Sequence, residues 1–203
     1  ARDPSYSAWP NVVTEGEFIL LSRYPILEHS PITAVGTVKT GIEQVTVAAR
    51  FVVDWKGTRI AVYLVHMPTP RDLIEWYAKG GTFLHGLFPF TEKHEFYQQH
   101  WENRVNFARQ LKEDMEGEKL PFILMGDCNT PPRGRAYNTI SSGLQDCHKE
   151  GGKGFGFSFP GTTHNPLALF RPWMRIDYVF ADRNWRVQSF DTEEGRRSQH
   201  QAV

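Results

Sequence analysis

The stretch Phe122-Ile-Leu-Met-Gly-Asp127-Cys-Asn129-Thr-Pro131 is the most informative about the fold, because an apolar strand ends there in two polar, oxygen-bearing side chains. Asp127 and Asn129 lie two residues apart, so in an extended segment they project from the same face. Gly126 permits a close approach of the backbone, and Pro131 ends strand pairing. The pattern predicts a sheet edge at which a divalent cation and a phosphate can meet.

Further stretches place polar residues at the ends of apolar strands. They are Leu20-Leu-Ser22-Arg23-Tyr-Pro25-Ile26, Val65-His66-Met67, Arg175-Ile-Asp177-Tyr-Val-Phe180 and Ser198-Gln-His200-Gln-Ala-Val203. In this order, with Gly-Asp-x-Asn among them, they resemble the endonuclease/exonuclease/phosphatase superfamily, which has a deoxyribonuclease-I-like fold. The resemblance implies an α/β (α+β) chain, a layered β-sandwich with helices on its outer faces.

The resemblance covers roughly residues 16–203 and implies the later part of the fold, incomplete at both ends. Superfamily members carry two more site residues upstream, an Asn that ends the first strand and a metal-binding Glu in a Gln-Glu pair. Asn11, Glu15 and Glu17 do not stand in that arrangement. Gln199 stands where the superfamily usually has Asp beside His, and an amide cannot stabilise an imidazolium by charge.

The composition predicts a single domain over residues 1–203, with residues 1–15 left undetermined. Lys plus Arg and Asp plus Glu balance at 23 each, so no overall positive field attracts nucleic acid. Two cysteines are too few for a disulfide framework, and no histidine pair has the spacing of a zinc site. No uninterrupted apolar run reaches the roughly 18 residues that predict a membrane span. The sequence indicates no obligate protein partner and assigns no compartment.

Hydrophobic periodicity predicts the secondary structure. Alternating or apolar runs predict strands over residues 18–22, 45–55, 59–66, 120–125, 175–181 and 185–190, the last two paired as a hairpin. Apolar residues at a spacing of three to four predict an amphipathic helix over 95–115, and 132–142 reads as a short helix. Residues 23–31 read as a turn-rich exit, and 67–97 as an aromatic-rich insertion over the sheet edge.

Asp127 and Asn129 are the predicted metal ligands and are also assigned to catalysis. A carboxylate at a strand end can bind Mg²⁺ or Mn²⁺ or orient the attacking water, and the Asn129 amide would hold the phosphate or that water. The alternative for Asp127 is a turn aspartate that caps the next segment. The alternative for Asn129 is an Asx-turn before Pro131.

Asp177 and His200 are the predicted proton-handling pair. By the resemblance, Asp177 orients a catalytic group, and His200 is the general base or the cation that stabilises the transferring phosphate. The alternatives are a salt bridge from Asp177 to Arg175, two residues away on the same strand face, and a frayed terminal histidine.

His66, Arg175 and Trp173 complete the predicted site. By the resemblance, His66 donates a hydrogen bond to a phosphate oxygen, and the alternative is an ordinary strand-end histidine. Arg175 and Trp173 precede or begin the Asp177 strand and are expected to contact substrate, together with Asn129 and His66.

The resulting hypothesis is a Mg²⁺- or Mn²⁺-dependent phosphoesterase that cleaves a phosphodiester by in-line attack of water. The substrate would be a nucleic acid, a phospholipid or a small phosphate ester. One alternative is a catalytically impaired member that acts as a binding module, which the missing Glu and Gln199 favour. Another is a phosphomonoesterase that acts on a lipid or sugar phosphate.

Overall fold

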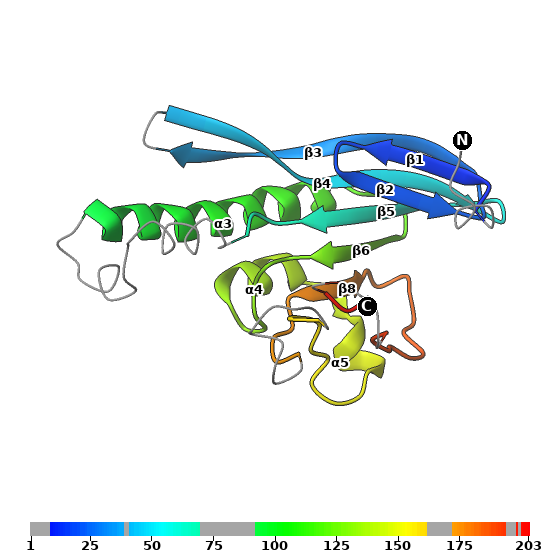
Figure 1. The fold of residues 1–203 in the computed structure, drawn as a ribbon. Coiled ribbons are helices and arrows are strands. Elements are labelled where there is room, and N and C mark those ends of the chain that lie inside the picture. The colour runs from blue at the N-terminus through cyan, green and yellow to red at the C-terminus, as the bar shows by residue number, and fades with distance from the viewer. Residues whose placement is uncertain (1–8, 39–40, 70–91, 162–171, 194–197, 199) are drawn as a thin grey trace.

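The computed structural model describes residues 9–38, 41–69, 92–161, 172–193, 198 and 200–203. Its strands are β1 (Asn11–Glu15), β2 (Phe18–Ser22), β3 (Ile26–Val38), β4 (Gly41–Trp55), β5 (Thr58–His66), β6 (Phe122–Asp127), β7 (Gln145–Asp146) and β8 (Asp177–Ala181). Its helices are α3 (Glu92–Glu116), α4 (Arg135–Ser141) and α5 (Cys147–Gly151). The large sheet has the order β3-β4-β5-β6-β8-β7, and β1 and β2 form a separate hairpin (Figure 1).

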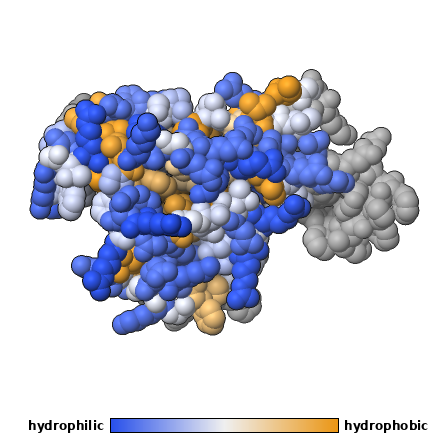
Figure 2. Space-filling model, turned by 180° about the vertical axis from the view of Figure 1, so that it is seen from behind, coloured by the Kyte–Doolittle hydropathy of each residue, from blue (hydrophilic) through white to orange (hydrophobic). Residues whose placement is uncertain are grey.

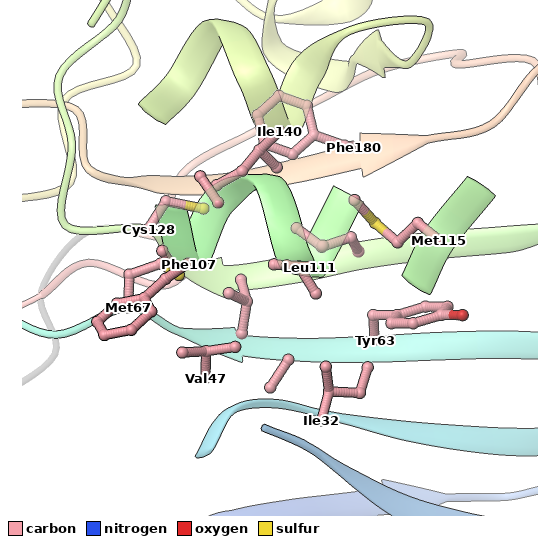
Figure 3. Packing of buried hydrophobic residues seen from close by; sticks show 14 of the residues in the cluster. Ile32, Val47, Tyr63, Met67, Phe107, Leu111, Met115, Cys128, Ile140 and Phe180 are labelled. Carbon is pink, nitrogen blue, oxygen red and sulfur yellow. The ribbon is translucent and has the colours of Figure 1, made fainter. Parts of the chain in front are cut away.

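The central strands are buried on both faces, which explains their near-continuous apolar sequences. On one face, alternate residues of β4 and β5 pack with apolar side chains of α3 and α4, as Figure 3 shows; this cluster includes Val47, Tyr63, Phe107, Leu111 and Ile140. On the other face, the intervening residues pack against the β1–β2 hairpin; this cluster includes Phe18, Leu20, Phe51 and Val62. The layered α/β architecture expected from the resemblance is therefore confirmed.

Helix α3 protects the exposed edge of β3. Side-chain amides of Asn103 and Gln110 exchange hydrogen bonds with the backbone N–H and C=O of Thr37 and Val35, over 2.6–3.0 Å. An unpaired strand edge invites pairing with another chain, and these amides occupy it. Gly36 lets the helix approach, because a Cβ there would lie 2.6 Å from the Phe107 ring.

The helix prediction for residues 95–115 is confirmed, with α3 beginning slightly earlier. Ala108, Leu111 and Met115 are buried as expected, whereas Trp101 is half-exposed and lies over the Arg104 guanidinium. The turn-rich exit predicted for residues 23–31 is wrong in part, because β3 begins at Ile26. Proline is tolerated inside it since β3 is an edge strand, which needs fewer backbone donors. Most of the predicted insertion, residues 70–91, lies outside the described residues.

The hairpin predicted between residues 175–181 and 185–190 is also wrong. β8 pairs with β6 on one side and with β7 on the other, so neither edge is free for a third strand. The segment that follows β8 makes only isolated bridges, between Phe190 and Gly152 and between Glu193 and Ala202, within the part of the chain that the structure describes.

The surface carries its apolar residues in small groups. On the face shown in Figure 2, hydrophobic residues form separate areas within a largely hydrophilic surface. Exposed large side chains such as Ile19, Ile42 and Trp101 belong to different elements. Among the helices in the described ranges, none combines the length and the apolar character needed to cross a bilayer.

Glu118 fastens the end of α3 to the sheet. Its side chain is 5% exposed; it accepts hydrogen bonds from Arg50 Nε (2.6 Å) and Tyr63 Oη (3.0 Å) and from the backbone N–H groups of Lys119 and Leu120. Burial alone would raise the pKa of Glu118, but the hydrogen bonds from Arg50, Leu120 and Tyr63 outweigh it and lower the pKa to about 2. The carboxylate therefore favours the folded state.

Replacing Glu118 with Gln should lower the free energy of unfolding at pH 7 by about 3 kcal/mol, because Arg50 is left beside a neutral group. The folded-state pKa of about 2 lies below the ordinary 4.5. The stabilisation is thus complete above pH 4.5 and disappears as the pH falls towards 2. Urea unfolding of both proteins from pH 7 down to acid pH should show the difference shrinking. Glu116→Gln, at an exposed i,i+4 pair with Lys112, is the matched control; an equal loss at every pH would contradict this account.

Candidate active site

Three strand ends meet at one edge of the large sheet. His66 ends β5, Asp127 ends β6 and Asp177 begins β8. The strand register pairs His66 with Asp127, and Asp127 with Asp177. Adjacent strands lie about 4.8 Å apart, so residues distant in sequence become neighbours. The structure thus brings three of the predicted site residues together.

Gly126 makes this alignment possible. Its φ is 133°, a conformation that other residues rarely adopt. A Cβ at this position would lie 2.2 Å from the Val65 carbonyl oxygen, so β6 can approach β5 only because the side chain is absent. The glycine of the Gly-Asp-x-Asn motif therefore has a steric explanation that is independent of chemistry.

His200 reaches the same edge from the end of the chain. Its Nδ1 lies 2.8 Å from Asp177 Oδ2, and its Nε2 lies 3.9 Å from Asp127 Oδ2. With Nδ1 donating to Asp177, Nε2 is the ring nitrogen that faces Asp127. The alternative of a salt bridge between Asp177 and Arg175 is not formed.

The segment around His200 is held in place rather than frayed. The N–H of Gln201 donates to the Ser158 carbonyl (2.7 Å), and the Ser158 hydroxyl accepts from the N–H groups of Ile176 and Asp177. The Phe159 ring packs on the imidazole, with 5.0 Å between ring centroids. A hollow of about 340 Å³ opens beside Asp177 and His200.

Burial and neighbouring charges shift the pKa values of Asp127 and His200. Burial, and next the nearby Asp177 carboxylate, raise the pKa of Asp127 to about 6, although the Asn129 N–H and the two histidines oppose this. The hydrogen bond to Asp177 raises the pKa of His200, against the opposing effect of burial. The titrations of Asp127 and His200 are therefore coupled to the charges around them.

The same side chains fit a divalent cation. One ligand atom from each of Asp127, Asp177 and His200 lies within 4.8 Å of the others. Carboxylate oxygens are the donors that hard cations prefer, and a cation would relieve the repulsion from Asp177 that, after burial, raises the pKa of Asp127. The donor set therefore suits Mg²⁺ or, with the imidazole, Mn²⁺.

Asn129 follows Asp127 in a left-handed conformation, with φ of 47°. Its N–H donates to Asp127 Oδ1 (2.7 Å). The side chain that forms an Asx-turn is therefore that of Asp127, whereas the sequence pattern indicated an Asx-turn as the alternative role of Asn129. Its side-chain Nδ2 donates to the Met67 carbonyl (2.8 Å). With Nδ2 so engaged, the amide oxygen is the atom that can face a cation or a water.

His66 has a partner that the sequence did not reveal. Its Nδ1 lies 3.1 Å from Glu17 Oε1, and both side chains are exposed. Glu17 lies in the tight turn between β1 and β2, 49 residues away, so no spacing connects it with His66. An acid from the second layer therefore approaches the sheet edge, although not in the Gln-Glu arrangement of the superfamily.

Arg175 does not point into this site, which corrects its predicted contact with substrate. The guanidinium is buried and donates to Asp146 and to His148 Nδ1 (3.0 Å), while Tyr137 also donates to Asp146 (2.6 Å). Strand alternation predicted that Arg175 and Asp177 would project from the same face. Arg175 precedes β8, however, so this alternation does not apply to it. Through these hydrogen bonds, Arg175 links the start of β8 to β7 and α5.

Trp173 remains available for contact. The residue is 47% exposed, and its backbone N–H donates to the carbonyl of Phe159, the residue that packs on His200. The residues just before it, 162–171, lie outside the described part of the chain. Trp173 is therefore hydrogen-bonded to the residue whose ring supports His200.

A profile of the Endonuclease/Exonuclease/phosphatase family matches residues 14–200. The chain belongs to this family, whose members are hydrolases that act on phosphoesters. No curated protein matches the sequence.

Solved structures show the same fold at low sequence identity. An endonuclease/exonuclease/phosphatase family protein from Leptotrichia buccalis has a TM-score of 0.56 and 17% identity, over 90% of this chain and 61% of the other. A mannosyl-6-phosphatase of Bacteroides thetaiotaomicron has a TM-score of 0.54 and 17% identity, over 90% and 67%. A 3′ phosphatase of Neisseria, bound to a product DNA hairpin, has a TM-score of 0.52 and 14% identity, over 90% and 71%. The chain thus spans 61–71% of the length of these relatives.

Replacing Asp177 with Asn should lower the pKa of the His200 imidazole, because the hydrogen bond that raises it loses its charge. An NMR titration of the imidazole in metal-free protein measures this directly. In the wild type, the stabilisation from the pair is complete below pH 6.5 and is lost as the pH rises through the elevated pKa of His200. Asp182→Asn, an acid that binds Asn184 in an exposed turn, is the control. An unchanged pKa of His200 in Asp177→Asn would contradict the pairing.

Proposed function

We propose that the chain carries a divalent-metal-dependent phosphoesterase site that hydrolyses a phosphodiester by in-line attack of water. The observation that supports it most is the cluster of Asp127, Asp177 and His200, with ligand atoms within 4.8 Å of one another. Membership of a family of phosphoester hydrolases supports the reaction class. The proposal applies to the part of the fold that this chain spans.

In this proposal Asp127 holds the cation, together with the amide oxygen of Asn129. A bound Mg²⁺ or Mn²⁺ supplies charge neutralisation to the phosphate oxygens. Asp127, largely buried and with a pKa raised to about 6, also orients the attacking water. Its hydrogen bond from the Asn129 N–H fixes one carboxylate oxygen and leaves the other for these tasks.

His200 and Asp177 manage the proton. Asp177 accepts from Nδ1 of His200, which fixes the ring and stabilises its protonated form. The free Nε2 then takes a proton from water or stabilises charge on the phosphate. His66, oriented by Glu17, donates a hydrogen bond to a phosphate oxygen in the same scheme. Trp173 is proposed to contact the substrate beyond its phosphate.

Phosphomonoester hydrolysis is the second candidate. Two of the structural relatives are named as phosphatases, one of a mannosyl phosphate and one of a 3′ phosphate, and the mechanism above serves either ester. A binding module without turnover is the third candidate, because Gln199 replaces the acidic neighbour that the superfamily usually places beside the histidine.

Purified protein should hydrolyse bis-p-nitrophenyl phosphate when Mg²⁺ or Mn²⁺ is added, and chelation should abolish turnover. Asp127→Asn, Asp177→Asn and His200→Ala should each lower kcat by about a hundredfold or more, because each removes a charge or a proton acceptor at the reacting phosphate. Asp182→Asn is the matched control and should retain activity.

The competing candidates give different results in the same assay. A preference for p-nitrophenyl phosphate over the diester would select the phosphomonoesterase. Folded protein without turnover on either ester, with any metal, would overturn the proposal in favour of the binding module.

A further inference from the structure

We propose that Arg104 on α3 is a positioning residue for the site: its guanidinium links the chain segments that leave β5 and β6 and thereby fixes the orientation of Asn129. This inference rests on the proposed function, because it assigns a role within that same site. Arg104 lies outside every motif that the sequence analysis identified.

The contacts of Arg104 define this role. Its Nη1 donates to the Pro68 carbonyl (2.8 Å), and its Nη2 donates to the Asn129 carbonyl. Pro68 follows β5 and Asn129 follows β6, so one side chain joins the exits of the two strands that carry His66 and Asp127. The hydrogen bond from Asn129 Nδ2 to Met67 joins the same two segments. Asn129 is therefore held at both its backbone carbonyl and its side-chain amide.

Burial of the Arg104 guanidinium carries a desolvation cost that a purely structural role does not require. Arg104 is 2% exposed, and both of these partners are neutral carbonyls rather than carboxylates. Burial lowers its pKa to about 10, opposed by the negative charge of Asp127, so the group stays protonated at neutral pH. An apolar side chain of similar length would fill the same space without this desolvation cost. What it would lose is the link between the two segments.

Asn129 needs such a link because of its backbone. Its φ of 47° lies in the left-handed region, which asparagine adopts more readily than other non-glycine residues but less readily than glycine. The conformation persists when surrounding contacts fix it. Arg104 supplies one such contact through the Asn129 backbone carbonyl.

The test compares Arg104→Met and Arg104→Lys with Arg109→Met, an exposed arginine on the same helix that donates only to Asn106 among the contacts described. In the esterase assay, Arg104→Met should lower kcat by about a hundredfold with a much smaller change in KM, because misplacement of a positioned group impairs the reaction more than binding. Arg104→Lys should recover part of the loss, and Arg109→Met should match the wild type.

Combination with Asn129→Ala separates positioning from simple stabilisation. If Arg104 acts through Asn129, the double variant Arg104→Met/Asn129→Ala should have the kcat of Asn129→Ala alone. Losses that multiply, or a kcat that falls only in proportion to the unfolded fraction seen in urea unfolding, would overturn the proposal.

A readout that needs no turnover keeps this inference distinct from the proposed function. The side-chain amide resonances of Asn129 should shift in Arg104→Met and stay unchanged in Arg109→Met. Unchanged resonances in Arg104→Met would contradict the positioning role. Shifted resonances in a protein whose wild type lacks turnover would support the positioning role and contradict only the phosphoesterase.

Discussion

The parallel pairing of β5 with β6 is the constraint on which the site depends. Parallel strands require a crossover connection, and α3 lies in that connection. The register sets Asp127 beside His66, and the antiparallel pairing with β8 adds Asp177. A slip of one residue would turn these side chains to the opposite faces of the sheet. The close approach of Gly126 to the Val65 carbonyl leaves no room for a Cβ at that position, so this register requires glycine there.

This alignment has an electrostatic consequence. It brings two largely buried carboxylates to one edge, where burial and mutual repulsion raise the pKa of Asp127. His200 offsets part of the charge through Asp177, and the Asn129 N–H satisfies one oxygen of Asp127. Such an arrangement destabilises the folded protein and favours a bound cation, since both effects come from the same unneutralised charge. At this edge, the same charges that favour binding of a cation lower the stability of the folded protein without it.

The sequence predicted those parts of the fold and site that depend on local pattern. The apolar runs gave the central strands because those strands are buried on both faces, and the helical spacing gave α3 because one face of that helix is buried. The short motifs marked Asp127, Asp177 and His200, which the structure brings together. The sequence could not give the partners of Arg175 or His66, because Asp146 and Glu17 come from distant elements that only the tertiary fold brings near. It also placed a strand after β8, where no sheet edge is free.

The two buried arginines Arg175 and Arg104 have different partners and different roles. Arg175 is paired with the Asp146 carboxylate, so its charge is neutralised where it contributes to the packing of β7, α5 and β8. Arg104 binds two carbonyls, and the negative charge of Asp127 acts on it from the edge where the site lies. If Arg104 served packing alone, a carboxylate partner such as that of Arg175 would stabilise it better. Its hydrogen bonds to two backbone carbonyls instead link the segments that follow β5 and β6.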